Sequence, residues 1–218
     1  GKSKDGHNVL LHSTAHLMAQ AVKRLYPKTK VTIGPFLENR FYYDFDVETP
    51  FTEEDLLKIE EEMLKISNEN IDIIHEEKTR EEALSFFKNI GEDYKIEIIN
   101  DLDDSEILKV YSHGDFTDLC RGPHVQSTGM MQHFKLLSSS AAYWRGDENN
   151  QTLQRVYGTS FTSAKDLKKY LLMLEEQKKR DHRKIGKELD LYFHDEEVGP
   201  GLPLWTPNGA VIIDQLEA

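Results

Sequence analysis

The chain has 218 residues, 38% hydrophobic and 30% charged, which is enough to bury the core of one or two globular domains. Lysine and arginine total 27 against 39 aspartates and glutamates, and the formal charge of −12 excludes a protein covered by nucleic-acid-binding surface. One cysteine excludes an intramolecular disulfide framework, and no apolar run approaches the roughly 18 residues of a membrane span. Because the opening GKSKDG lacks the pattern of a secretory leader, a cytoplasmic protein with no membrane partner is expected.

The first third of the chain predicts a helix, a hairpin and a second helix. Apolar residues at helical spacing predict a helix from Asn8 to about Tyr26, which Pro27 ends. Residues 30–33 and 40–47 have the β-branched and aromatic content of two strands joined by a turn. Thr52 and Asp55 then form a capping box in front of an amphipathic helix.

The middle of the chain predicts mostly strands. Residues 71–75 and the alternating segment 94–99 are typical of strands, and Thr79 with Glu82 begins a short helix between them that ends near Asn89. Helical periodicity disappears over residues 108–157, where glycines separate short apolar runs. Together these elements predict an α+β fold, in which helices pack on a largely antiparallel sheet.

The last part of the chain predicts a linker helix followed by the beginning of another domain. Ser163 and Asp166 start a helix that runs to about Gly186, and residues 165–187 carry nine basic against four acidic side chains, a local charge of +5. This basic segment is either a solvated helix face or an edge that contacts phosphates. A glycine- and proline-rich loop and an apolar helix start follow Glu188, so the expected domains are 1–160, 161–187 and 188–218.

Two pairs of side chains have the spacing of a functional site. His12 and His16 project from one helix face, and Cys120 and His124 share the four-residue spacing on a bent loop. Three imidazoles and a thiolate suit a tetrahedral zinc ion, and they suit equally a cluster of donors and acceptors around water. A conventional metalloprotease would need glutamate where this chain has Ser13, which argues against that class.

Asp118, Lys95 and one of two adjacent tyrosines extend this candidate site. Asp118 lies two residues before Cys120, so both side chains point the same way in extended chain and a carboxylate joins the cluster. Lys95 interrupts the predicted strand YKIEII, where it faces either solvent or a cleft. Of the adjacent Tyr42 and Tyr43, one must face the core while the other can line the cleft.

Several segments, in chain order, resemble the threonyl-tRNA synthetase family. They are HSTAHLMAQAV, VTIGPFLENRFYYDFD, YKIEII, DLCRGPHV, HFKLLSSSAAYWRGDENNQTLQRVYGTSF and KRDHRKIGKELDLY. The HxxxH and CxxxH pairs alone are shared with alanyl-tRNA editing domains, whereas the later segments are specific to the threonyl family. The resemblance implies a bacterial-type editing domain over 1–160, a linker helix over 161–187 and the truncated start of a class II catalytic domain over 188–218.

The resemblance also implies which residues act. It assigns substrate binding to Tyr43, and catalysis to a group of six residues: His12, His16, Lys95, Asp118, Cys120 and His124. Our hypothesis gives Lys95 and His12 the positioning of water, and Asp118 the binding of the substrate's ammonium group or the fixing of a histidine tautomer. The other three clustered residues would orient the ester and the ribose. Contact with tRNA is expected from the basic side chains Lys178, Lys179, Arg180, Arg183 and Lys184.

The implied reaction is hydrolysis of serine from threonine tRNA. Because serine lacks only the methyl group of threonine, binding discriminates by about 1–3 kcal/mol, and a second, hydrolytic site must remove the error. The family pattern implies that this cluster works without a metal. A zinc-dependent hydrolase, with zinc at His12, His16, Cys120 and His124, and a non-catalytic tRNA-docking module stay alternatives. ATP, magnesium and the catalytic zinc belong to segments outside this chain, so no ligation is expected from it. The full synthetases are homodimers through their catalytic domains, and the fragment is expected to be a monomer.

Overall fold

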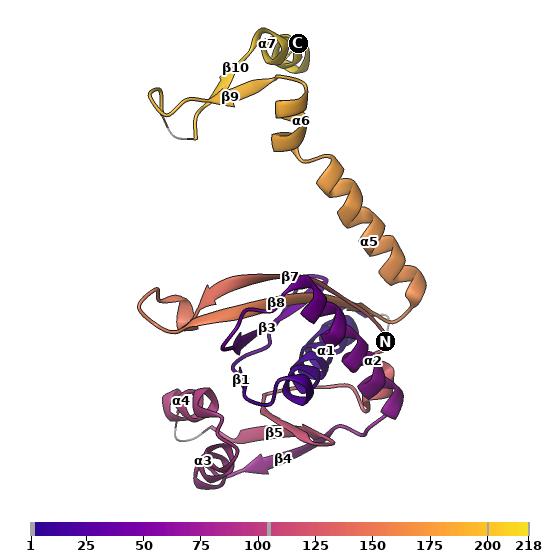
Figure 1. The fold of residues 1–218 in the computed structure, drawn as a ribbon. Coiled ribbons are helices and arrows are strands. Elements are labelled where there is room, and N and C mark those ends of the chain that lie inside the picture. Colours follow the sequence, from indigo (N-terminus) through magenta and orange to yellow (C-terminus); the bar gives the residue numbers. More distant parts are fainter. Residues whose placement is uncertain (1–2, 104–105, 200, 218) are drawn as a thin grey trace. The chain divides into compact units, whose positions relative to one another are not determined.

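The computed structural model describes residues 3–103, 106–199 and 201–217, and Figure 1 shows the order of their elements. Contacts within the chain divide it into two compact units, Gly1–Leu167 and Lys168–Ala218. The first unit combines helices with antiparallel sheets, so the predicted α+β class is confirmed. Among the described residues, none of the helices has the length and apolar content needed to cross a lipid bilayer.

Helix α1 (Lys4–Leu25) is the central element of the first unit, and it contacts both the large sheet and helix α2 (Figure 1). Leu11, Leu17 and Met18 on this helix are completely buried. The helix ends before Pro27, as predicted, but its predicted start at Asn8 is wrong. It begins four residues earlier because the side chain of Ser3 accepts a hydrogen bond from the backbone N–H of Gly6.

The large sheet lies against one side of α1. Its strands are antiparallel in the order β1-β3-β8-β7, and β2 also pairs with β3. Their bounds are Lys30–Val31 (β1), Phe36–Leu37 (β2), Arg40–Asp46 (β3), His133–Tyr143 (β7) and Thr152–Phe161 (β8). The predicted hairpin is confirmed, since Lys30 pairs with Asp46. Phe41, Tyr43 and Phe45 alternate along β3 and are fully buried in the core beside α1.

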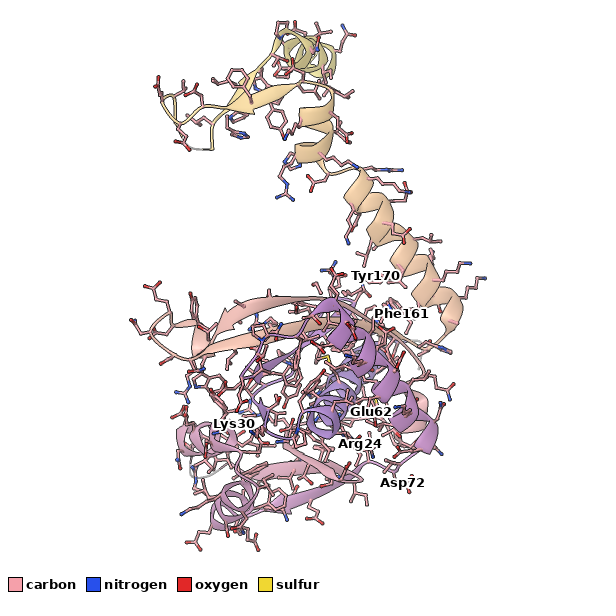
Figure 2. The ribbon with its side chains drawn as sticks, viewed as in Figure 1. Arg24, Lys30, Glu62, Asp72, Phe161 and Tyr170 are labelled. Atoms are coloured by element: carbon pink, nitrogen blue, oxygen red, sulfur yellow. The ribbon has the colours of Figure 1, made fainter. Side chains whose placement is uncertain are left out.

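Helix α2 (Glu53–Glu69) packs on α1 and starts at the predicted capping box of Thr52 and Asp55. Its apolar side chains Ile59, Met63 and Ile66 are fully buried, and burial of each is worth about 1.5–3 kcal/mol. Figure 2 labels Arg24 on α1 and Glu62 on α2, whose Nη1 and Oε1 atoms lie 3.6 Å apart.

A smaller antiparallel sheet has the strand order β4-β5-β6, with bounds Ile74–Lys78, Leu108–His113 and Phe116–Leu119. The strand predicted at residues 71–75 therefore begins three residues later. Helix α3 (Arg80–Asn89) starts at the predicted capping box of Thr79 and Glu82. Between residues 108 and 157 the chain forms strands and loops as predicted, with helical structure limited to 3-10 turns at Thr128–Met130 and Trp144–Gly146.

Helix α4 (Asp93–Asp101) corrects the prediction of a strand over residues 94–99. Ile99 packs with the core of the small sheet, while Tyr94, on another face of the helix, packs against Trp144. The β-branched and aromatic content suggested a strand, but apolar partners on two sides stabilise the helix instead. Lys95 also does not face solvent: it is 1% exposed and points from α4 into the interior of the first unit.

The second unit begins within helix α5 (Ala164–Lys179). The prediction of one continuous helix to Gly186 is wrong, because α5 ends at Lys179 and a separate helix α6 (His182–Glu188) follows. Asp181 causes the break: its side chain accepts a hydrogen bond from the backbone N–H of Arg183 and so caps α6. The remaining elements are β9 (Tyr192–His194), β10 (Pro203–Trp205) and α7 (Pro207–Glu217), and β9 and β10 form an antiparallel pair.

Candidate active site

Helix α1 presents His12 and His16 on the same face, as their spacing predicts. Their ring centroids lie 5.1 Å apart, with the rings at 77° to each other. His16 is 3% exposed and is buried among the core residues, whereas His12 is one turn nearer the helix start and stays half-buried. One imidazole is therefore enclosed by the protein while the other reaches its surface.

Cys120 and His124 lie on the loop that follows β6. The backbone N–H of Cys120 donates to the carbonyl of Lys109, which continues the pairing with β5 and fixes where the loop begins. Gly122 has a φ of +65°, and a Cβ at this position would lie 2.1 Å from Oη of Tyr111. Only glycine fits this close, left-handed turn, which bends the loop back toward α1.

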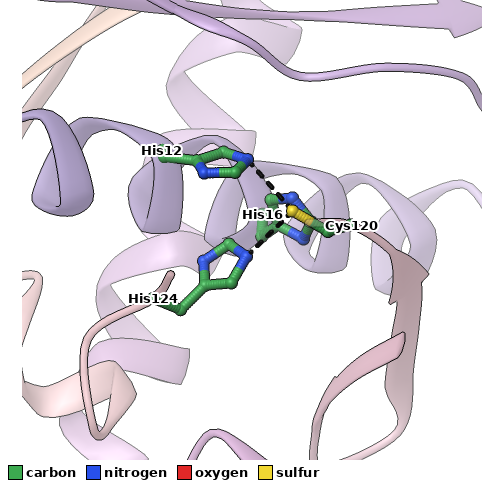
Figure 3. A group of neighbouring side chains, drawn as sticks. All are labelled: His12, His16, Cys120 and His124. Carbon is green, nitrogen blue, oxygen red and sulfur yellow. Dashed lines mark hydrogen bonds between the residues drawn. The ribbon is translucent and has the colours of Figure 1, made fainter. Parts of the chain in front are cut away.

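The structure brings the two pairs together (Figure 3). Cys120 Sγ lies 3.2 Å from His12 Nε2 and 3.3 Å from His124 Nε2. The ring centroids of His16 and His124 are 4.4 Å apart. One ligand atom from each of the four residues lies within 4.8 Å of the others. We call His12, His16, Cys120 and His124 the thiol–imidazole cluster.

A buried ion pair lies directly beside the thiol–imidazole cluster. Lys95 Nζ pairs with Asp118 Oδ1, and both side chains are 2% exposed. Asp118 Oδ2 accepts a 2.7 Å hydrogen bond from Tyr43 Oη and lies 3.4 Å from His16 Nδ1. Lys95 also donates to the carbonyl of Thr32 and, over 3.2 Å, to Tyr43 Oη. The ammonium group thus contacts three oxygen atoms, one for each of its N–H bonds.

The backbone between β1 and β2 packs on Tyr43, the tyrosine that contacts this ion pair. A Cβ at Gly34 would lie 2.2 Å from Cδ2 of Tyr43, so the backbone of the loop packs directly on the tyrosine ring. Tyr43 therefore faces the ion pair from the core. Tyr42 is on the opposite face of β3. There the guanidinium of Arg155 stacks on its ring, with Arg155 Cζ 4.0 Å from the ring centroid.

Burial keeps the thiol–imidazole cluster uncharged at neutral pH. It lowers the pKa of His12, and it lowers the pKa of His16 well below the ordinary value, with further contributions from His124, His12 and Lys95. Burial, followed by the charge of His12, lowers the pKa of His124 to about 3. Desolvation raises the pKa of the Cys120 thiol to about 12. Neutral imidazoles keep a free lone pair, so they can accept a proton or bind a metal.

The cluster also fits a zinc ion by its donor set. Around tetrahedral zinc, with bonds of about 2.0–2.3 Å, ligand atoms lie roughly 3.3–3.8 Å apart. The Sγ to Nε2 distances of 3.2 and 3.3 Å are close to this separation. His12, His16, Cys120 and His124 would hold the ion, which would have to displace the thiol proton.

Sequence reasoning missed two residues behind the cluster, Gln20 and His113. Gln20 Nε2 donates to the carbonyl of His113 and to Asp115 Oδ1, which leaves Gln20 Oε1 to accept from His113 Nδ1 at 2.7 Å. Gln20 follows His16 by four residues on the same helix face, and this spacing was the available signal. Burial lowers the pKa of His113 to about 4, so this imidazole is neutral as well.

The pKa of His113 predicts a pH dependence of stability. The unfolded chain, with a histidine pKa near 6.5, binds more protons than the folded protein between about pH 6.5 and 4, so the free energy of unfolding falls as the pH falls through that range. The pKa difference of 6.5 − 4, about 2.5, corresponds to about 3 kcal/mol. His113→Asn keeps a donor for Gln20 but cannot titrate, and denaturant unfolding at several pH values should show a smaller slope than in the original protein. If the free energy of unfolding depended on pH equally in both proteins, His113 would not be the group that causes the dependence.

The five basic residues expected to contact tRNA lie in the second unit. Four of them form ion pairs with acidic side chains of the same segment: Lys179 and Arg180 with Glu176, Arg183 with Asp181, and Lys184 with Glu188. All of these cations are exposed, the least exposed being Lys184 at 59%. Such exposed pairs are worth about 0–1 kcal/mol and open at little cost, so their contact with tRNA stays a prediction.

Comparison with known families gives the class of protein that this fold and site define. Residues 108–157 match the family described as "Threonyl and Alanyl tRNA synthetase second additional domain". The matched segment carries Asp118, Cys120 and His124, the loop half of the site. The first unit therefore contains a segment that matches the second additional domain of threonyl and alanyl tRNA synthetases.

Curated relatives narrow this class to one family. The chain is 57% identical over 210 residues to threonine–tRNA ligase of Anoxybacillus flavithermus, covering 96% of this chain and 33% of the relative. It is 57% identical over 215 residues to the enzyme of the same name from Maridesulfovibrio salexigens, covering 99% of this chain and 33% of the relative. These matches support a fragment of the threonyl-tRNA synthetase family, and the chain spans about a third of the length of these relatives.

Proposed function

We propose that the first unit hydrolyses the ester that joins serine to the 3′-hydroxyl of threonine tRNA. The observation that carries this proposal is the thiol–imidazole cluster beside the Lys95–Asp118 ion pair. The loop half of this site lies in the segment that matches the second additional domain of threonyl and alanyl tRNA synthetases. Ester hydrolysis needs a positioned water, a proton acceptor and a group that stabilises the developing oxyanion. The neutral imidazoles supply proton acceptors. Lys95 supplies a positive electric field, and the Cys120 thiol supplies a hydrogen-bond donor.

The exposure of the site residues suggests how they divide these tasks. His12, Cys120 and His124 are half-buried and reach the surface, so the ester and the attacking water would approach from their side. His12 is our candidate to accept the proton of the water. Lys95 already contacts three oxygen atoms, so it would act through Asp118 instead of touching water as first expected. Asp118 then fixes Tyr43 and His16 behind the reacting groups.

The rest of the chain would serve this reaction by presenting tRNA. We propose residues 1–160 as the editing domain, 161–187 as the linker and 188–218 as the start of the class II catalytic domain, in a cytoplasmic enzyme. Mischarged threonine tRNA would be the partner, bound partly by the basic residues around α5 and α6. Ligation with ATP and magnesium, and dimerisation, are proposed for the longer enzyme.

The direct test compares two esters on the same tRNA. We expect the chain to deacylate threonine tRNA charged with serine faster than the same tRNA charged with threonine, by at least about tenfold, because the pocket must exclude one methyl group. The measurement is loss of radiolabelled amino acid from each tRNA at high protein concentration, since the net charge of −12 weakens binding. Equal rates for the two esters, or rates no faster than those without protein, would refute the proposal.

A zinc-dependent hydrolase is the second candidate function, because the donor set of the cluster fits the ion. Bound zinc would polarise the ester carbonyl or a water molecule as a Lewis acid. We expect serine release to survive prolonged dialysis against a chelator and elemental analysis to find less than one zinc per chain. One zinc per chain, together with activity that chelation removes and zinc restores, would establish the alternative. Cys120→Ser serves as the control that should abolish such binding.

A further inference from the structure

Ser13 connects the loop that carries His124 to helix α1. The side chain is completely buried, and its Oγ has three polar neighbours. Oγ lies 2.8 Å from the carbonyl oxygen of Val9 and 3.0 Å from His124 Nδ1, and it accepts a 3.0 Å hydrogen bond from the backbone N–H of Val125. Two consecutive residues of the loop therefore meet one hydroxyl group of the helix.

The protons around this hydroxyl can be assigned from chemistry alone. A serine hydroxyl has one proton to donate, a carbonyl oxygen can only accept, and a backbone N–H can only donate. Two oxygen atoms 2.8 Å apart repel each other unless a proton lies between them, so Ser13 must donate to Val9. The hydroxyl then has no proton left for the imidazole, and His124 Nδ1 must itself be the donor to Ser13 Oγ.

We infer that Ser13 is a positioning residue that holds His124 in the tautomer protonated at Nδ1 and so keeps the lone pair of Nε2 directed into the thiol–imidazole cluster. A free neutral imidazole of histidine prefers the other tautomer, protonated at Nε2, which would turn a donor toward the cluster. The hydrogen bond from the backbone N–H of Val125 to Ser13 Oγ holds the loop in place, so His124 keeps the tautomer protonated at Nδ1. The value of this tautomer for catalysis rests on the proposed function, whereas the tautomer itself does not.

The tautomer decides what the centre of the cluster can do. His124 Nε2 faces Cys120 Sγ at 3.3 Å, and the backbone N–H of Gly122 already donates to this sulfur at 3.2 Å. The thiol therefore has an acceptor for its own proton in His124. When an ester and a water enter, the same lone pair can accept a hydrogen bond from the water instead and hold that water for proton transfer to His12. With the other tautomer, two N–H donors would face the sulfur and this acceptor would be lost.

The experiment is a nitrogen NMR spectrum of the full chain labelled at its histidine rings. Protonated and unprotonated ring nitrogens resonate far apart, and couplings to the ring carbons show which nitrogen is which. The spectrum of His124→Gln identifies the signals of His124 by their disappearance. We expect a protonated Nδ1 and an unprotonated Nε2 for His124 at neutral pH, and a protonated Nε2 in the original protein would overturn the inference.

Ser13→Ala tests whether the hydroxyl causes this choice, and Thr14→Ala is its matched control. Thr14 is the next residue, is also buried, and makes the same kind of bond to the carbonyl four residues before it, at 2.7 Å to Leu10. We expect His124 to gain a protonated Nε2 in Ser13→Ala and to stay unchanged in Thr14→Ala. An unchanged tautomer in a folded Ser13→Ala protein would overturn the inference, and if that variant does not fold, the original spectrum still decides it.

Kinetics separate this inference from the proposed function. We expect Ser13→Ala to lower kcat for serine release roughly 10- to 100-fold with little change in KM, because the substrate still binds while His124 no longer holds the attacking water. Thr14→Ala should keep kcat within about threefold. A protein with the expected tautomer but no serine release would refute the proposed function and support the tautomer assignment. A full loss of kcat in Thr14→Ala as well would overturn the specific role of Ser13.

Discussion

Lys95→Met is expected to lower the free energy of unfolding of the first unit by about 3–5 kcal/mol. The substitution removes the ammonium group and leaves the Asp118 carboxylate, 2% exposed, without its cation. It also removes the donors to the carbonyl of Thr32 and to Tyr43 Oη. Chemical denaturation, followed by a signal from the first unit, measures the change.

A second substitution shows whether charge is the cause. Lys95→Met combined with Asp118→Asn removes both charges and leaves an amide oxygen that can still accept from Tyr43. We expect the double variant to recover much of the lost free energy of unfolding. Its rate of serine release should stay at least about 100-fold below that of the original protein, because the electric field of the ion pair is gone. A single variant as stable as the original protein, or a double variant no more stable than the single one, would contradict this account of the ion pair.

His12→Ala is expected to reduce kcat for serine release by about 10²- to 10⁴-fold, the usual contribution of a positioned proton acceptor. The imidazole is half-buried at the surface side of the cluster, so its removal leaves a space that water can fill. The free energy of unfolding should therefore change by less than about 1 kcal/mol. Single-turnover deacylation of serine-charged threonine tRNA, with the protein in excess, measures the chemical step directly.

The matched control for this prediction is His133→Ala, which removes an imidazole on β7 of the same unit, outside the cluster. We expect this variant to keep kcat for serine release within about threefold of the original protein. If His12→Ala retained full activity, His12 could not be the proton acceptor. If the two variants lost activity equally, the loss would reflect a general effect of removing histidines.

The helix ends show which parts of the fold local sequence controls. Pro27 ends α1, and the capping boxes at Thr52 and Thr79 start α2 and α3 where predicted, since each signal acts within one helical turn. The two helix ends that differ from the prediction have local causes too, because Ser3 and Asp181 are ordinary capping residues. These features needed no knowledge of distant contacts.

Segment 94–99 shows where local sequence fails. Its alternating β-branched residues are compatible with a strand, and only the packing of Ile99 on one side and Tyr94 on another makes it a helix. That same packing buries Lys95 and directs its ammonium group to Asp118. Contacts with residues elsewhere in the chain thus decide that this segment is a helix and that Lys95 is buried.

The sequence by itself determined the chemistry that the site could contain. It also determined the local geometry within each pair, because residues four apart on α1 share a face and a glycine permits the tight turn before His124. Only the tertiary structure decided that the two pairs meet, that Lys95 joins them from α4, and that Ser13 fixes the protons of His124. The physical reason is that hydrogen bonds and burial between residues about 110 positions apart depend on packing of the whole unit, which no local spacing encodes.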